Sequence, residues 1–242
     1  MLNQSVCSKG STPIPSIGRV FGRKSLVALL CIVSVCLAAF SAMPAQAQSC
    51  IAPPAGMVSW WPGDNNANDI ASANNGTLEN GATFATGKVS QAFNLDGSSG
   101  YIRVANHPSL DTPDGFTVDA WIYPRTFGGP KVIASKWDDP TGQWSWIFKL
   151  HNDGSGRLRI EISRGDHNAL GDLEGVSILP LNMWSHVAAS YDRLTNRLRL
   201  YVNGNVDNEG FARFPGVAIN NSATDLLIGA HSGQITPPLS TS

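Results

Sequence analysis

The chain has 242 residues, of which 14% are charged and 42% are hydrophobic, and it contains 24 Gly and 15 Pro. This composition excludes a disordered acidic or basic chain, a coiled coil and a collagen. Low charge combined with frequent Gly, Pro, Asn, Ser and Thr is typical of short strands joined by turns.

The first 47 residues have the order of a secretory signal. Basic residues without any acid come first, an apolar run of 15 residues follows at 26–40, and Ala45-Gln46-Ala47 ends the segment. This order is that of a cleaved signal peptide, and the run is short of the roughly 20 residues that span a bilayer. We predict that residues 1–47 are removed, which leaves a secreted, periplasmic or extracellular protein without a membrane span. An uncleaved anchor is the alternative.

Cleavage changes the charge and the cysteine content of the protein. The mature chain carries 13 Lys and Arg against 18 Asp and Glu, a net charge of −5. A negative protein is repelled by phosphate backbones, so no nucleic-acid partner is predicted. Cys50 alone remains of the four cysteines, which excludes an intrachain disulfide.

Alternation of apolar and polar residues predicts strands along the mature chain. In residues 116–123 the side chains of Phe116, Val118, Ala120 and Ile122 share one face. Runs at 144–150, 157–162, 184–191 and 197–202 alternate in the same way. Weaker strands are predicted at 58–61, 82–84, 92–95, 101–104, 132–136, 176–178 and 226–229, with one helical turn near 109–111.

Turn residues separate these strands. Residues 152–156 and 192–196 are polar loops, and Asn203-Gly204 is a strong hairpin signal because both residues tolerate positive φ. About a dozen strands with one wetter face predict an all-β, two-sheet antiparallel sandwich over residues 48–230. Residues 231–242 lack alternation and are predicted to form a loose C-terminal tail.

Three motifs in sequence order carry a family resemblance. Residues 95–102 read Leu-Asp-Gly-Ser-Ser-Gly-Tyr-Ile, residues 107–110 lead into the strand at 116–122, and residues 183–188 run on to the strand and turn at 200–204. Together they resemble the laminin G-like and pentraxin-like jelly roll of the concanavalin A-like lectin/glucanase superfamily, over residues 57–229. The resemblance implies a sandwich of 12–14 strands that often carries calcium and binds carbohydrate or protein as a module of a larger secreted protein.

The resemblance also implies a closing strand of the type G-x-I-D-E-V-R-I-Y beside the first strand. Here residues 226–230 are followed by a segment that includes Pro237 and Pro238, which cannot donate backbone hydrogen bonds. We therefore predict a jelly roll that lacks its usual last strand. The strand at 58–61 would expose an unpaired edge, through which the chain would self-associate.

No catalytic residue is predicted. The metalloprotease pattern H-E-x-x-H and the serine-hydrolase pattern G-x-S-x-G are absent. Glucanases of the resembled superfamily use E-x-D-x-E on one strand, which the residues after Glu161 do not match. Asp166, Asp172 and Glu174 are the remaining candidates for a carboxylate pair, in what reads as a solvated loop. A polysaccharide hydrolase and a structural or adhesive fragment remain the alternatives to a binding module.

Oxygen-rich residues at 64–75 suggest calcium. The predicted ligands are Asp64, Asn66, Asp69 and Asn75, with Asp96 at a strand end as a distant fifth. Calcium takes six to eight such oxygens, backbone carbonyls included. Asn and Asp are also ordinary turn formers, which is the alternative reading.

A polar loop between two tryptophans is the predicted carbohydrate site. Its ligand-binding residues are Trp137, Asp138, Asp139 and Trp144, with His151 from the next hairpin. Exposed indole rings stack on sugar rings, and carboxylates or imidazoles bind sugar hydroxyls. Packing of these tryptophans in the core or at its rim is the alternative. The predicted partner is a glycan or an extracellular protein.

Overall fold

The computed structural model of this chain describes residues 53–165 and 167–234. The predicted signal at 1–47 and the tail beyond Gln234 lie outside this range. Within it, no helix has the length and apolarity needed to cross a membrane. The strands are β1 (Gly76–Glu79), β2 (Thr83–Thr86), β3 (Gln91–Asn94), β4 (Tyr101–Val104), β5 (Gly115–Ile122), β6 (Lys131–Asp138), β7 (Gln143–Leu150), β8 (Leu158–Ser163), β9 (Ala169–Glu174), β10 (Ser185–Asp192), β11 (Arg197–Val202), β12 (Asn205–Phe211) and β13 (Leu226–Ile228).

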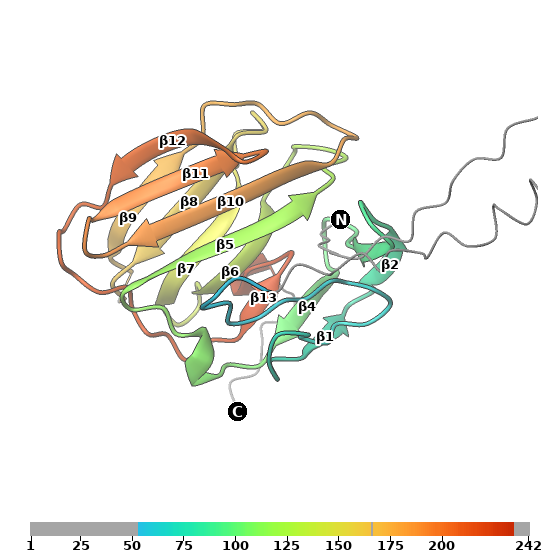
Figure 1. Ribbon diagram of the computed structural model, residues 1–242, viewed down its shortest axis with the longest axis horizontal. Coiled ribbons are helices and arrows are strands. Elements are labelled where there is room, and N and C mark those ends of the chain that lie inside the picture. Colours follow the sequence, from blue (N-terminus) through green and yellow to red (C-terminus); the bar gives the residue numbers. More distant parts are fainter. Residues whose placement is uncertain (1–52, 166, 235–242) are drawn as a thin grey trace, which may run out of the picture. The chain divides into compact units, whose positions relative to one another are not determined.

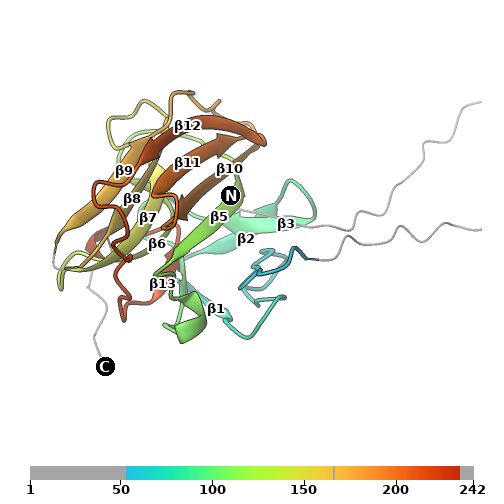
Figure 2. The same ribbon diagram turned by 60° about the vertical axis from the view of Figure 1, so that its left-hand side comes forward.

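These strands build an antiparallel sandwich. One sheet has seven strands in the order β1-β4-β13-β6-β7-β8-β9, and the other has four in the order β12-β11-β10-β5. Figures 1 and 2 show the four-stranded sheet lying across the strands of the larger sheet. A separate hairpin, β2–β3, lies beyond β5 on the side away from β10 in both views. The predicted all-β sandwich is confirmed.

The core lies between the two sheets because alternate side chains of each strand point inward. Leu158, Ile160 and Ile162 of β8 are fully buried. Phe116 of β5 stacks on Trp146 of β7, with ring centroids 5.1 Å apart, and so joins the two sheets. Burial of each aliphatic side chain of β8 contributes about 1.5–3 kcal/mol to the stability of the fold.

The predicted turns have the expected backbone. Asn203 and Gly204 have φ values of +50° and +81° and connect β11 directly to β12. The loop at 152–156 joins β7 to β8, and the helical turn is a 3-10 turn at Pro108–Leu110. The positions of these turns could therefore be predicted from their residue types.

Two predicted strands are wrong. Residues 58–61 join no ladder, because the backbone N–H of Trp60 donates to Asp69 and the indole of Trp61 donates to the carbonyl of Asn74. Residues 176–178 form an exposed loop, and the strand lies just before it, at β9. Strands β1, β9 and β12 were not predicted.

The strand β5 has a ladder partner on one side only. It pairs with β10 along its full length, and no other described strand pairs with it. Strand β13, by contrast, is central and lies between β4 and β6. Residues 58–61 do not form a strand, so the unpaired strand edge predicted there is not found, and β5 is instead an outer strand of the four-stranded sheet.

Candidate functional site

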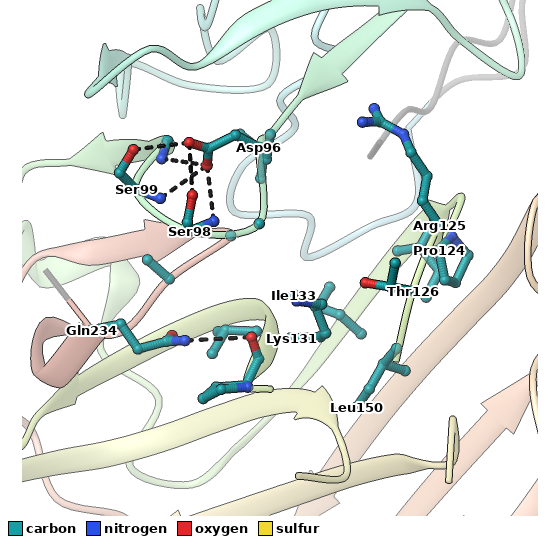
Figure 3. Close-up of a pocket in the computed structure, with 18 of the residues that line it drawn as sticks. Asp96, Ser98, Ser99, Pro124, Arg125, Thr126, Lys131, Ile133, Leu150 and Gln234 are labelled. Atoms are coloured by element: carbon teal, nitrogen blue, oxygen red, sulfur yellow. Dashed lines mark hydrogen bonds between the residues drawn. The ribbon is translucent and has the colours of Figure 1, made fainter. Parts of the chain in front are cut away.

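A pocket of about 320 Å³ opens where three segments meet: the turn after β3 (95–100), the end of β5 with the residues after it (122–126), and the start of β6 (130–133). Ile122, Ile133 and Leu150 give it an apolar wall. Leu95 reaches this wall because Gly229, at φ +93°, has no side chain: a Cβ there would lie 2.1 Å from Leu95 Cδ1. Figure 3 shows the 96–99 turn facing Pro124, Arg125 and Thr126 across the pocket.

Asp96 organises the turn on one side of the pocket. Its Oδ1 accepts the backbone N–H groups of Ser98, Ser99 and Gly100, each at 2.9 Å. Its Oδ2 accepts the hydroxyls of Ser98 at 3.0 Å and Ser99 at 2.9 Å. The N–H groups of Ser98, Gly100 and Ser99 hold the pKa of Asp96 far below its usual value. Both oxygens of this predicted metal ligand are therefore already occupied.

Two cationic side chains also line the pocket. Lys131 is half-buried at the start of β6, and Arg125 is exposed and donates to Asn94 Oδ1. Gln234 closes the rim and donates to the carbonyl of Pro130 at 3.4 Å. Sequence reasoning missed this site because its residues come from three distant segments and share no local pattern.

The two tryptophans of the predicted carbohydrate site stack on each other. Trp137 and Trp144 have ring centroids 4.6 Å apart and planes 12° apart, and the edge of His167 contacts Trp144 at 4.6 Å. Trp137 is 8% exposed and packs with Val132 and Ile147 in a small cluster separate from the main core. Trp144 is the half-buried ring of the pair.

The carboxylates of this loop bind parts of the protein itself. Asp138 accepts the Ser232 hydroxyl at 2.6 Å, and Asp139 accepts the indole N–H of Trp137 at 2.8 Å. Asp139 also lies 3.0 Å from His231, whose pKa is lowered by burial although Asp139 opposes the shift. The loop is thus fastened to the segment after β13.

His151 does not join the tryptophans. It follows β7, whereas Trp144 lies near the beginning of that strand, and seven residues of extended chain span about 23 Å. The structure therefore divides the predicted carbohydrate residues between opposite ends of β7.

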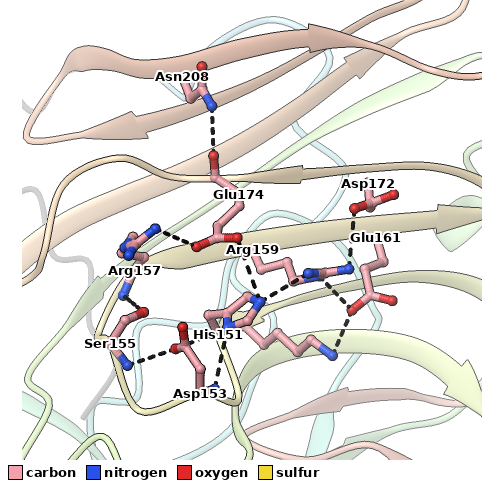
Figure 4. Close-up of polar contacts among 10 residues, drawn as sticks. His151, Asp153, Ser155, Arg157, Arg159, Glu161, Asp172, Glu174 and Asn208 are labelled. Atoms are coloured by element: carbon pink, nitrogen blue, oxygen red, sulfur yellow. Dashed lines mark hydrogen bonds and ion pairs between the residues drawn. The ribbon is translucent and has the colours of Figure 1, made fainter.

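His151 belongs instead to a charged network on the outer face of β7, β8 and β9 (Figure 4). The guanidinium of Arg159 lies 3.1 Å from Glu161, 3.2 Å from Asp172 and 3.0 Å from His151 Nε2. A guanidinium can only donate, so Arg159 directs an N–H group at Nε2, while Nδ1 lies 3.3 Å from the backbone N–H of Asp153 and 2.9 Å from Asp153 Oδ1.

One trio in this network has the donor set of a metal site. His151, Asp153 and Glu174 bring one ligand atom each within 4.8 Å of one another, and divalent metals bind such nitrogen and oxygen donors. Arg157 lies 2.8 Å from Glu174, however, and Arg159 contacts His151. The arginines supply the positive charge that an ion would bring.

Two of the candidate catalytic carboxylates lie in strand β9 and not in a loop. Asp172 and Glu174 pair with arginines, and Glu161 of the neighbouring β8 lies 2.7 Å from Lys149. Asp166 lies outside the described residues. The described carboxylates of this group are thus engaged in ion pairs with neighbouring basic side chains.

The predicted calcium segment is folded around Asp69. Its carboxylate accepts the backbone N–H groups of Trp60, Ala71 and Ser72 and the hydroxyl of Ser72. Burial favours protonation of Asp69, but these hydrogen bonds outweigh it and lower the pKa.

The other predicted ligands in this segment are partly engaged. Asn75 Oδ1 accepts the Asp69 N–H, Asn66 Oδ1 accepts the Asn68 N–H, and Asp64 is exposed and accepts the Ser90 hydroxyl. The segment does not contact Asp96 through any described hydrogen bond, since all five bonds of Asp96 stay within its own turn.

The chain is similar to several solved structures, of which an arabinanase domain shares the fold. Domain 4 of AbnA, a GH43 extracellular arabinanase from Geobacillus stearothermophilus, is 19% identical with a TM-score of 0.53, over 69% of this chain and 79% of that chain. CBM40 of a Ruminococcus gnavus IT-sialidase is 10% identical, with a TM-score of 0.42 over 58% and 82%. Domains LG4-5 of the mouse laminin alpha1 chain are 13% identical, with a TM-score of 0.41 over 56% and 32%.

Sequence comparison gives the family. No curated protein matches this chain significantly. A laminin G-like family model, described as concanavalin A-like lectin/glucanases superfamily, matches residues 96–240, which is more than half of the sequence. The resemblance inferred from the three motifs is thereby confirmed, and the chain belongs to the concanavalin A-like lectin/glucanases superfamily.

Proposed function

We propose that this protein is an extracellular, non-catalytic carbohydrate-binding module and that its pocket at 95–100, 122–126 and 130–133 holds the sugar. The observation that carries the proposal is the pocket itself: a concave site of about 320 Å³, within the usual size range of ligand sites. It combines an apolar wall with hydroxyl, amide and cationic groups at its rim.

The chemistry of the pocket suits a saccharide. A sugar ring has apolar C–H faces, which Tyr123 and Leu95 can contact, and a rim of hydroxyls that need hydrogen-bond partners. Thr126 and the Ser98 and Ser99 hydroxyls offer such partners. The solved structure of AbnA domain 4 is of a complex with arabinotriose, which makes arabino-oligosaccharides the first probes to use.

We also propose that the module is exported and that mature protein begins near Gln48. The basic, apolar and A-x-A order of residues 1–47 supports this proposal. Intact-mass analysis of protein recovered from the medium or periplasm checks it. Retention of residues 1–47 there would overturn it.

A glycan array with calcium and with chelator, followed by titration calorimetry, tests the function. Thr126→Trp places an indole in the pocket mouth and should abolish binding, whereas Trp144→Ala, at the loop predicted from sequence, should leave it unchanged. The opposite result would move the site to the tryptophan loop. Release of reducing sugar would favour the hydrolase alternative, and the absence of any glycan hit would reject the proposal.

A further inference from the structure

The charges around the pocket are unbalanced. Its lining includes two cationic side chains, Arg125 and Lys131, and one acidic side chain, Asp96. The Asp96 carboxylate already accepts three backbone N–H groups and two hydroxyls, so its oxygens have no capacity left for either cation. The pocket therefore presents positive charge to a ligand.

Among the lysines that the structure describes, Lys131 differs from the others in having no interaction partner for its ammonium. Lys149 lies 2.7 Å from Glu161, Lys136 donates to Asn106 at 2.7 Å, and Lys88 lies over the ring of Trp121. The Lys131 ammonium, in contrast, makes no hydrogen bond or ion pair with any described residue. It lies beside the 95–100 turn, because a Cβ added to Gly97 would be 3.5 Å from its Nζ.

Lys131 is half-buried as a residue, and its ammonium has no counterion among the described residues. An anionic group on the ligand would supply the missing interaction. Arg125 supports it from the other side of the pocket, because the bond to Asn94 uses one of its five N–H donors.

The hydroxyls of the turn fit the remaining part of a sugar. Ser98 and Ser99 direct their hydroxyl protons to Asp96, which leaves their oxygen lone pairs as acceptors. Sugar hydroxyls can donate to these oxygens while an anionic substituent accepts from Lys131. The Lys131 ammonium and these hydroxyl oxygens thus lie close together at the 95–100 turn, and Arg125 faces them across the pocket.

We propose that the pocket selects a sugar residue that carries an anionic group, a carboxylate or a sulfate, and that Lys131 determines this preference. The inference rests on the proposed function, since it assigns the ligand class of the same site. Its failure and the failure of the proposed function are separable by experiment.

The test is calorimetry of the full mature chain with trigalacturonate, its neutral methyl ester and a galactose oligosaccharide sulfated at O6. The acid form should bind about tenfold tighter than the ester at low salt, and the ratio should shrink at high salt. Lys131→Met should bring the ratio to about one without weakening the ester. Lys88→Met, which removes an equal charge outside the pocket, should leave the ratio unchanged.

The ligands distinguish the outcomes. Tight binding of the uronate alone identifies a carboxylate site, and tight binding of the sulfated sugar alone identifies a sulfate site. Equal affinity of wild type for acid, sulfate and ester would overturn the inference and leave the proposed function intact. A preference that persists in Lys131→Met would exclude Lys131 as its source.

Discussion

The ammonium of Lys136 lies 3.2 Å from the carboxylate of Asp111, and the lysine side chain is only 1% exposed. Burial lowers the pKa of Lys136, while the hydrogen bond and charge of Asp111 oppose the shift. This pair fastens the residue that follows the 3-10 turn to the central strand β6. Lys136 also donates to Asn106 Oδ1 at 2.7 Å.

Removing the charge of Asp111 should lower the free energy of unfolding more than replacing Lys136 by an apolar residue. Asp111→Asn leaves a buried cation without a counterion and should lower the free energy of unfolding by about 3 kcal/mol, whereas Lys136→Met fills the same space without charge and should cost less. Urea denaturation of both variants measures the difference. A larger loss in Lys136→Met would show that the pair itself is net stabilising.

Asp96 should contribute to stability above its unfolded pKa and lose that contribution in acid. Its pKa is depressed in the folded state from an ordinary value of 3.8, so the unfolded chain takes up the proton first as the pH falls. Wild type should lose stability below about pH 4, and Asp96→Asn should lose less over that range. Because the side chain is exposed, solvent screening limits the effect to below about 1 kcal/mol.

Thermal melts between pH 2 and pH 7 measure this difference, with Asp114→Asn as the control for loss of one exposed charge. Asp114 pairs with Arg193 at the surface and takes no part in the pocket. Parallel stability curves for wild type and Asp96→Asn would contradict the prediction.

Calcium should raise the melting temperature if the segment at 64–75 binds it, and chelator should reverse the rise. A hundredfold excess over Kd would add about 2.7 kcal/mol. Asp64→Ala should abolish the response, because Asp64 is exposed and its carboxylate accepts only the Ser90 hydroxyl among the described residues. Asp153→Ala, in the arginine-neutralised trio, is the matched control and should respond as wild type does. Identical melting curves with calcium and chelator would reject the site.

The free edge of β5 should make the protein self-associate as concentration rises. The outer edge of this eight-residue strand, which has no ladder partner among the described strands, is a template for a further strand. Thr117→Lys puts a charge on this edge strand and should favour the monomer, and Thr195→Lys, in the β10–β11 turn, should not. Light scattering and calorimetry check both variants. A wild-type chain that stays monomeric and melts cooperatively would show that the edge is protected.

The strands that could be predicted were those with one fully buried face. Alternation placed β5 within one residue at each end, because Ala120 and Ile122 point into the core. Strands β1 and β9 were missed because they lack such a face. Thr77 and Asp172 belong to short or polar segments that become strands only through pairing with β4 and β8. Pairing of that kind leaves no local period in the sequence.

Site residues were predicted less well because a site depends on distances that no local pattern contains. Trp144 and His151 are seven positions apart in the sequence and were predicted to share one site, yet they lie at opposite ends of β7. Asp96 shows the opposite case. The run Asp-Gly-Ser-Ser-Gly at 96–100 is typical of a carboxylate that caps its own turn, and this reading competes with its assignment as a metal ligand.

The parallel stack of Trp137 on Trp144 should give the β6–β7 hairpin end a circular dichroism signal of its own. Two indoles 4.6 Å apart couple their electronic transitions, so their circular dichroism depends on the β6–β7 hairpin end and not on the chain as a whole. Loosening of that corner, or of the His167 edge against it, can thus be followed spectroscopically without any label and separately from global unfolding.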